Sequence, residues 1–279
     1  MSAHERKESA LQPPCAYQGG KQRLAKAITS IIRLDKQYFY DLCCGSGAVS
    51  LAFRSKGVSP DRLVLVDKSP WGLFWQEIGR GTFSLKEFRY HLDQLPANIE
   101  QIPTYLRTLS QTLAEPETCV YIYLLLQSGS FGSKAIWIDG GRWRNCTFRS
   151  YWKPTAISSR HSPVNPMMPM PDTLYERVCR IAEAMYGCQG IWGDVRDVQI
   201  SENSVVYIDP PYQGTTAYGF NFDVLDFVKS LNVRAYVSEA VPLSPQAVQV
   251  SGTRSKGGIS GVRQTANQEW ISCFNGDIT

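Results

Sequence analysis

YFYDLCCGSGAVSLAFRSKGVSPDRLVLVDK, at residues 38–68, sets the architecture of this chain. Its start, YFYDLCC, is a short strand candidate that runs into the glycine turn Gly45-Ser46-Gly47, and a helix-like stretch, AVSLAF, follows. A second apolar run, RLVLVDK at 62–68, is a buried strand candidate. Strand, glycine turn, helix and strand in this order are the repeating unit of a doubly wound α/β sheet.

Apolar segments of the same kind recur on both sides of this unit. Upstream, the spacing of apolar residues predicts a helix over 21–32. Downstream lie runs of β-branched and aromatic residues, typical of strands covered on both faces: GIWGDV (190–195), SVVYIDPPY (204–212), RAYVSEAV (234–241), VQVSGT (248–253) and EWISCFN (269–275). We therefore predict an α/β fold with a Rossmann-like, doubly wound and mostly parallel sheet.

The middle of the chain, residues 72–188, interrupts this alternation. Its helix-like stretches are 85–92, 102–113, 121–127 and 173–185. Segment 130–154 is rich in Arg, Lys, Gly and Trp, and the Pro- and Met-rich segment 162–171 must be a loop, because repeated prolines exclude a regular helix or central strand. We expect an inserted, mostly helical domain at 72–188. It would interrupt one domain formed by 14–71 and 189–279, which follows a flexible lead-in at 1–13.

The composition is that of an ordinary soluble globular protein. Of the 279 residues, 43% are hydrophobic and 19% are charged, and the formal net charge is +4. No apolar run approaches the roughly 20 residues of a membrane-spanning helix, and the polar start has no signal-peptide core. The eight cysteines form no CxxC pair, and none of the three histidines has ligand spacing to them. We therefore expect reduced thiols, no metal, no membrane partner and a cytoplasmic location.

The strongest chemical signal is Asp209-Pro210-Pro211-Tyr212, directly after the apolar strand candidate VVYI. Two prolines stiffen the chain at a strand end, which is where ligands bind in an open α/β sheet. The Asp209 carboxylate and the Pro210 carbonyl can accept the two hydrogens of an amine on a flat ring, on which Tyr212 can stack. The competing interpretation is a Pro-Pro turn with a solvated aspartate and a packing tyrosine.

Further candidates lie at two other strand ends and before the first helix. The glycines of Asp41-Leu-Cys-Cys-Gly45-Ser-Gly47 permit close backbone approach to a ligand. Asp67 ends the next strand, where an acid commonly holds ribose hydroxyls. An ordinary turn with a capping aspartate, or a dinucleotide site without its third glycine, is an alternative. Tyr17-Gln-Gly-Gly-Lys21 and Gly193-Asp194-Val195 are weaker signals, also typical of helix starts and caps.

In their order along the chain, these motifs resemble those of the Dam-type (D12 class) N6-adenine DNA methyltransferases. Tyr17-Gln-Gly-Gly-Lys21 is similar to the family's W-A-G-G-K, and Asp41 to Gly47 stands where the family has P-F-x-G-S-G. An acid, a long insert, a Gly-Asp pair and a DPPY motif follow in the family's order.

The resemblance continues to the end of the chain and spans about residues 14–275. Val237-Ser238-Glu239 resembles the family's I-S-N strand end, and the Gly-rich basic loop from Arg254 to Arg263, with Glu269, resembles its final loop. Three departures stand out, namely Tyr at 17 for Trp, Cys43-Cys44 for an aromatic-small pair, and Glu239 for Asn. The insert matches poorly, so no target sequence is carried over.

The resemblance implies an S-adenosylmethionine-dependent enzyme that methylates N6 of adenine in double-stranded DNA, bacterial or phage-encoded and able to act as a monomer. It implies a methyltransferase sheet with an inserted target-recognition domain. The cofactor would be bound by Tyr17, Lys21, Asp41, Gly45, Gly47, Asp67, Asp194 and Val195, with Asp67 on the ribose and Asp194 on the adenine amine. The target base would be held by Asp209, Pro210, Pro211 and Tyr212.

A base inside a duplex cannot reach such a pocket, so the enzyme must flip it out while basic side chains hold the DNA. The candidates are Lys134, Arg142, Arg144, Arg149 and Lys153 in the insert and Arg254, Lys256 and Arg263 near the end. Aromatic residues interleaved with the first group could stack on bases or fill the gap left by flipping. The competing interpretation is a β-hairpin that packs its aromatics inward beneath a solvated basic face.

Other functions are alternatives at this point. The same polar cluster would accept any planar amine, such as N4 of cytosine or an amine of an RNA base. A DNA-binding relative that lost catalysis, or one that transfers a larger group, is a third possibility. Covalent catalysis by Cys43 or Cys44 is disfavoured. Enzymes that methylate cytosine at carbon present a Pro-Cys motif at the strand end where this chain has Asp209, so both cysteines are interpreted as small core residues.

Overall fold

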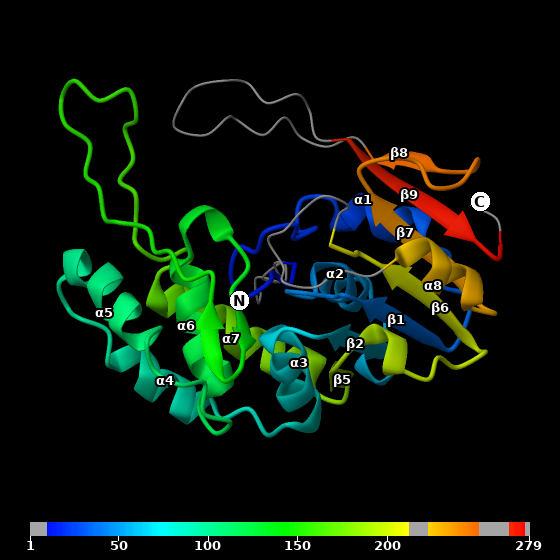
Figure 1. Cartoon of the computed structure of the whole chain (residues 1–279), viewed down its shortest axis with the longest axis horizontal. Helices are drawn as coiled ribbons and strands as arrows, with labels where there is room; N and C mark the ends of the chain where they lie inside the picture. Colours follow the sequence, from blue (N-terminus) through cyan, green and yellow to red (C-terminus); the bar gives the residue numbers. More distant parts are fainter. Residues whose placement is uncertain (1–9, 212–222, 251–267, 277–279) are drawn as a thin grey trace, which may run out of the picture.

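The computed structural model describes residues 10–211, 223–250 and 268–276. Figure 1 shows a twisted sheet flanked by helices, with a further group of helices gathered at one end. Seven strands of the described chain form this sheet in the order β5-β2-β1-β6-β7-β9-β8. Their bounds are β1 (Tyr38–Leu42), β2 (Leu63–Asp67), β5 (Gln189–Trp192), β6 (Ser204–Ile208), β7 (Arg234–Glu239), β8 (Val248–Val250) and β9 (Glu269–Phe274).

Two series of strands extend from the middle of the sheet, one toward each edge. From β1 the order proceeds to β2 and β5, and from β6 to β7, all pairing in parallel, whereas β9 is antiparallel to both β7 and β8. The direction of winding reverses between β1 and β6, and in an open α/β sheet such a switch point leaves a crevice at the carboxyl ends of the strands. The fold is thus α/β with a mostly parallel sheet, as predicted, and compatible with a Rossmann-like fold.

Successive side chains of each strand enter two different cores. Phe39 and Leu63 belong to one core, and their neighbours Tyr40 and Val64 to the other. Side chains alternate across a strand, so strands buried on both faces read as continuous apolar runs. The helices α1 (Ala25–Ile31), α2 (Ala48–Ser55) and α3 (Pro70–Arg80) pack into the first core, and α8 (Val224–Ser230) packs into the second. Helices therefore cover both faces of the sheet.

The helix α3 packs directly against the edge strand β5. The sequence analysis predicted no helix at residues 70–80. A β carbon at Gly79 would lie 2.0 Å from the carbonyl oxygen of Cys188, and one at Gly190 would lie 2.1 Å from the backbone of Trp75. Glycine at both positions lets the two backbones touch, and Trp71 and Trp75 are fully buried as a result. The domain boundary expected at residue 72 falls inside this helix.

The region 72–188 is mostly helical, with α4 (Leu85–Asp93), α5 (Ile102–Leu109), α6 (Cys119–Gly129) and α7 (Pro171–Met185). Every residue of α6 is buried, so this helix forms the centre of the region. The apolar side chains of these helices belong to the same core as one face of the sheet. Within the described residues, no helix is long and apolar enough to cross a membrane.

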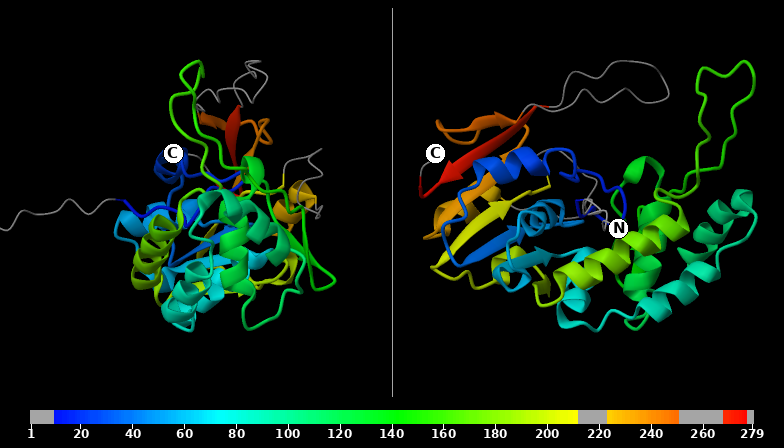
Figure 2. Two further views of the ribbon diagram at one scale, coloured as in Figure 1. Left: turned by 90° about the vertical axis from the view of Figure 1, so that its left-hand side faces the viewer. Right: turned by 180° about the vertical axis from the view of Figure 1, so that it is seen from behind.

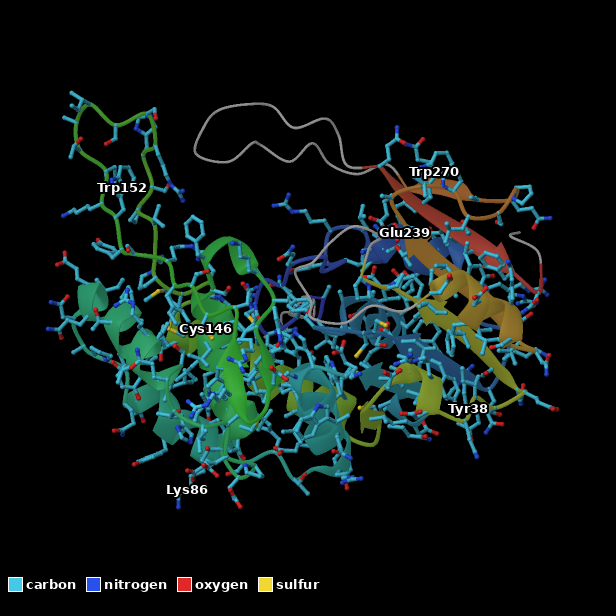
Figure 3. The ribbon with its side chains drawn as sticks, viewed as in Figure 1. Tyr38, Lys86, Cys146, Trp152, Glu239 and Trp270 are labelled. Carbon is cyan, nitrogen blue, oxygen red and sulfur yellow. The ribbon has the colours of Figure 1, made fainter. Side chains whose placement is uncertain are left out.

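A small hairpin and a long loop connect α6 to α7. The strands β3 (Trp137–Asp139) and β4 (Arg142–Arg144) pair antiparallel. The loop predicted at 162–171 is present over 162–170, and its last residue, Pro171, begins α7. The connection between β4 and α7 projects from the body of the molecule in all three views (Figures 1 and 2). Figure 3 places Trp152 on this projecting loop and Glu239 at the end of β7.

Candidate active site

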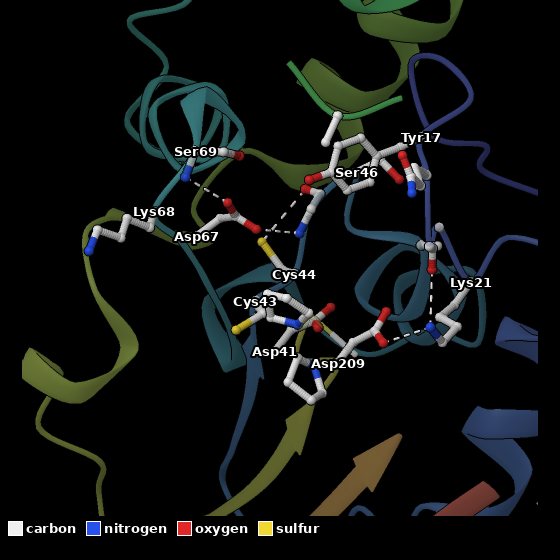
Figure 4. A pocket seen from close by; sticks show the side chains of 18 of the residues that line it. Tyr17, Lys21, Asp41, Cys43, Cys44, Ser46, Asp67, Lys68, Ser69 and Asp209 are labelled. Carbon is white, nitrogen blue, oxygen red and sulfur yellow. Dashed lines mark hydrogen bonds and ion pairs between the residues drawn. The ribbon is translucent and has the colours of Figure 1, made fainter. Parts of the chain in front are cut away.

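A cavity of about 490 Å³ opens where the parallel strands end (Figure 4). It lies at the edge of the sheet that the strand directions predict for a ligand site, and its volume is ordinary for such a site. It is lined by most of the predicted site residues, namely Tyr17, Lys21, Asp41, Gly45, Asp67, Asp194, Val195, Asp209, Pro210 and Pro211. Tyr212 lies outside the described residues.

The turn after β1 exposes its backbone to the cavity. Gly45 and Gly47 have φ angles of 50° and 69°, in the left-handed region that favours glycine. A β carbon at Gly45 would lie 2.9 Å from the ring of Tyr17, so glycine lets this ring cover the turn. At Gly47 a β carbon would lie 2.3 Å from the ring of Trp75. Gly47 does not line the described cavity, and packing against Trp75 explains why a small residue stands there.

Asp67, at the end of β2, holds its carboxylate beside this turn. The Gly45 N–H donates to Oδ2 at 2.7 Å, and the Ser69 N–H donates to Oδ1 at 2.8 Å. The side chain is buried, and burial raises the pKa of this carboxyl above its usual value. Because each carboxylate oxygen can accept two hydrogen bonds, both oxygens keep acceptor capacity for a ligand hydroxyl.

Asp194, just after β5, forms an ion pair with two cations. Arg196 donates from Nε to Oδ1 at 2.9 Å and from Nη2 to Oδ2 at 2.7 Å, and Lys68 Nζ lies 3.1 Å from Oδ2. The hydrogen bonds from Arg196 hold the pKa of Asp194 far below its usual range. A ligand amine at this position would have to share both oxygens with Arg196. The sequence interpretation missed Arg196 and Lys68, although each stands close to a predicted residue along the chain.

Asp209 forms a buried ion pair with Lys21, which is 188 positions away in sequence. Lys21 Nζ lies 2.6 Å from Oδ1 of Asp209, 3.0 Å from the Gly19 carbonyl oxygen and 3.6 Å from Oε1 of Glu269. Burial raises the pKa of Asp209 to about 7, although the charge of Lys21 lowers it. The lysine predicted for the cofactor pocket thus contacts the residue predicted for the target base.

Two glutamates make this end of the site acidic. Glu269 accepts a hydrogen bond from the Ser238 hydroxyl, and Glu239 accepts one from the Ala240 N–H at 2.7 Å. Their charges raise the pKa of Asp209 further. The sequence interpretation quoted Ser238, Glu239 and Glu269 for their resemblance to family motifs and gave them no role, because nothing in their local pattern indicates chemistry.

The wall formed by the end of β1 carries the fourth aspartate that lines the cavity, together with two thiols. Asp41 accepts hydrogen bonds from the Ser50 N–H at 3.2 Å and the Ser50 hydroxyl at 2.6 Å, and burial raises its pKa to about 7. Cys43 and Cys44 line the cavity and are only partly buried, so the interpretation of both as core residues was incomplete. Burial raises the pKa of both thiols well above the usual value, which keeps them protonated and weakly nucleophilic.

The region 72–188 contributes a wall that the sequence did not predict. Residues 135–137 line the cavity. The buried Gln127 donates from its amide to the Lys134 carbonyl at 3.0 Å and accepts from the Ile136 N–H at 3.0 Å, which fixes this segment. The Gln18 N–H donates to the Ser133 carbonyl at 2.7 Å and joins the segment to the Tyr17–Lys21 turn.

Of the basic residues predicted to hold DNA, the five between 134 and 153 do not line this cavity. Lys134, Arg142, Arg144 and Lys153 are exposed. Arg149 is partly buried and donates to the Ser130 carbonyl at 3.4 Å. Trp143 is buried and stacks on Tyr123 with ring centroids 6.5 Å apart, as the inward-packing hairpin interpretation anticipated. Arg254, Lys256 and Arg263 lie outside the described residues.

Comparison with known protein families and with characterised proteins finds no match for this chain. In the part of the chain that the structure describes, no group of three or more His, Cys, Asp or Glu residues is arranged to hold a metal ion. The function must therefore be inferred from the cavity itself.

Proposed function

We propose that the protein is a DNA methyltransferase that transfers a methyl group from S-adenosylmethionine to N6 of a flipped-out adenine. The observation that carries the proposal is one cavity in which Asp209 and Pro210 face the Gly45 turn and Asp67. The first pair suits an amine on a flat ring, and the second pair suits a nucleoside. The order of motifs that resembles the Dam-type enzymes supports the same function.

The residues around the glycine turn fit this cofactor. Asp67 is buried, is oriented by two N–H donors and keeps acceptor capacity for ribose hydroxyls. The Tyr17 ring provides an apolar surface beside the turn, and the carboxyl groups of Asp41 and Asp209 favour a positive charge nearby. S-adenosylmethionine supplies the methyl group on a positively charged sulfur. The cavity volume is in the range that holds one ligand of roughly this size.

Asp209 and Pro210 would prepare the amine for attack. The lone pair of an exocyclic amine is delocalised into the ring, which makes the nitrogen a poor nucleophile. Accepting one hydrogen at the Asp209 carboxylate and the other at the Pro210 carbonyl favours a pyramidal nitrogen with its lone pair available. Lys21 holds the carboxylate in place. After transfer the nitrogen carries one proton too many, and a carboxylate whose pKa is about 7 can accept it.

The target base must leave the duplex to reach Asp209, at a cost of a few kcal/mol. The exposed cations of the insert could hold the phosphates on either side. Trp152, on the projecting loop, has 39% of its surface exposed and is a candidate to fill the gap left by the base. Trp143 is not a candidate, because it is buried.

The test is mass spectrometry of nucleosides from unmethylated DNA incubated with the purified protein and S-adenosylmethionine. We expect N6-methyldeoxyadenosine from the wild-type protein and none from Asp209→Ala. An Asp226→Ala variant, which removes an exposed carboxylate of α8, should keep full activity. N4-methyldeoxycytidine would move the target to cytosine, and a methylated base from RNA only would refute a DNA substrate.

A further inference from the structure

A second cavity, of about 770 Å³, shares a wall with the first. The residues that line both cavities are Tyr17, Gly19, Gly20, Lys21 and Ser46. On its far side, the second cavity is bounded by Arg23 before α1, by Met168, Pro169 and Arg177 from the insert, and by Glu269 of β9. Three parts of the chain that are distant in sequence therefore meet around it.

The volume of the first cavity indicates that the methyl donor and the acceptor strand occupy separate cavities. Pockets that hold one drug-sized ligand have volumes of roughly 300–1,000 Å³, and the first cavity, at about 490 Å³, lies in the lower half of that range. A methyl donor bound there leaves little space for a nucleotide with its phosphates. The acceptor strand therefore needs a separate approach to Asp209.

The second cavity also reaches the Asp209 ion pair. Lys21 and Glu269 both line it, and Lys21 Nζ lies 2.6 Å from Asp209. Among its described lining residues, Lys21, Arg23 and Arg177 are cationic and Glu269 is anionic. The charge balance favours an anion in this cavity, whereas the first cavity is lined by four carboxyl groups and three cations.

Two arginines are placed to bind that anion. Arg23 is exposed, and Arg177 is half-buried on α7, where Nη1 donates to the Pro13 carbonyl at 3.4 Å. Neither forms a salt bridge with any carboxylate in the described ranges. A guanidinium presents a planar fork of N–H donors that matches a phosphate. Because both arginines line the same cavity, one ligand with more than one phosphate can contact both.

We propose that the second cavity binds the sugar-phosphate chain of a DNA strand next to the flipped nucleotide, with Arg23 and Arg177 as ligands of its phosphates. The inference rests on the proposed function, because it takes the acceptor amine to be the group that reaches Asp209. It assigns phosphate binding to two residues outside the basic hairpin and loop that the sequence singled out.

The experiment measures binding of a fluorescein-labelled 20-nucleotide single-stranded DNA by anisotropy, in the presence of S-adenosylhomocysteine. A single strand can enter the cavity without the cost of flipping. Each phosphate contact contributes about 0.7 to the slope of log K against log salt for single strands. The double variant Arg23→Ala/Arg177→Ala should therefore lower the slope by about 1.4. If the affinities converge at 1 M salt, binding at 50 mM salt weakens about 60-fold.

The matched control is Lys26→Ala/Arg180→Ala, which removes the same charge from α1 and α7 at positions that do not line the cavity. Calorimetric binding of S-adenosylhomocysteine, expected unchanged in both double variants, shows that each retains the folded cofactor cavity. Equal loss of DNA binding in the two double variants would overturn the inference, because it would show a general charge effect.

Methylation assays separate this inference from the proposed function. An Arg23→Ala/Arg177→Ala variant with wild-type kcat/KM on DNA would overturn the inference and leave the proposed function standing. A second outcome is that the wild-type protein methylates nothing, while Arg23→Ala/Arg177→Ala loses DNA binding and the control double variant does not. The proposed function then fails, and the assignment of phosphate binding to the second cavity holds. Tighter binding of an RNA strand of the same sequence, with the same dependence on the two arginines, would overturn the assignment to DNA.

Discussion

If the protein is the proposed methyltransferase, replacing Lys21 by glutamine should shift the pH dependence of methyl transfer. In the wild-type protein, Lys21 Nζ lies 2.6 Å from Asp209, yet burial raises the pKa of that carboxyl to about 7. The ionised carboxylate is the form that accepts amine hydrogens, so activity should rise as the pH passes through about 7 and then level off. Without Lys21 the carboxylate would face the charges of Glu239 and Glu269 with less compensation.

The size of the shift follows from the hydrogen bond that is lost. A hydrogen bond to a charged group contributes about 1.5–3 kcal/mol, and 1.36 kcal/mol corresponds to a tenfold change in protonation equilibrium. The midpoint of the pH–rate profile should therefore move up by about 1–2 pH units. At pH 7.5 the ionised fraction, and with it kcat/KM, should fall about 3- to 25-fold, and most of the loss should be recovered near pH 9.5.

The assay is kcat/KM for methyl transfer to DNA from pH 6 to pH 10, with Lys26→Gln as the control at an exposed position of α1. Breaking a buried ion pair can cost about 3–5 kcal/mol of stability, so thermal unfolding must show that Lys21→Gln is folded at each pH. A profile whose midpoint coincides with that of the wild-type protein would refute the coupling between Lys21 and Asp209. A uniform loss at every pH would assign Lys21 to ligand binding instead.

Three other substitutions test the site. Gly47→Ala should lower the free energy of unfolding in urea by about 1–3 kcal/mol, because its β carbon would meet the Trp75 ring and its φ is 69°. Asp67→Asn should weaken calorimetric binding of S-adenosylhomocysteine about tenfold or more, because an amide donor replaces one acceptor oxygen. Gln127→Leu should cost about 1–3 kcal/mol in the same urea assay, because the buried Ile136 N–H loses its acceptor; an unchanged midpoint would contradict this.

The position of four aspartates at one edge of the sheet could be predicted from the sequence alone. Asp41, Asp67, Asp194 and Asp209 each stand at or near the end of an apolar run. Parallel strands in one sheet place their carboxyl ends at one edge, so the spacing of these runs brings the four acids together without knowledge of any long-range contact. The structure places all four in the wall of one cavity.

The partners of these acids could not be predicted. The Lys21–Asp209 pair joins positions 188 apart, and no local periodicity relates them. The wall at 135–137 belongs to the insert, where the pattern of basic and aromatic residues indicated an exposed surface. Trp143 is buried by its stacking on Tyr123 and not by anything in its own strand. Contacts of this kind depend on tertiary packing, which overrides local pattern.

The carboxyl groups of Asp41 and Asp209 favour a cationic ligand beside them over a neutral one. Burial raises the pKa of Asp41 and of Asp209 to about 7, and the charge of Asp209 raises that of Asp41 further. A cation bound beside these groups would stabilise their ionised forms, and by linkage their ionisation would strengthen its binding. Under the proposed function, a methyl donor with a positive sulfur would gain this stabilisation, and the product left after transfer, whose sulfur is neutral, would lose it. In the proposed reaction, a carboxylate whose pKa burial raises to about 7 would be basic enough to take the proton from the methylated amine.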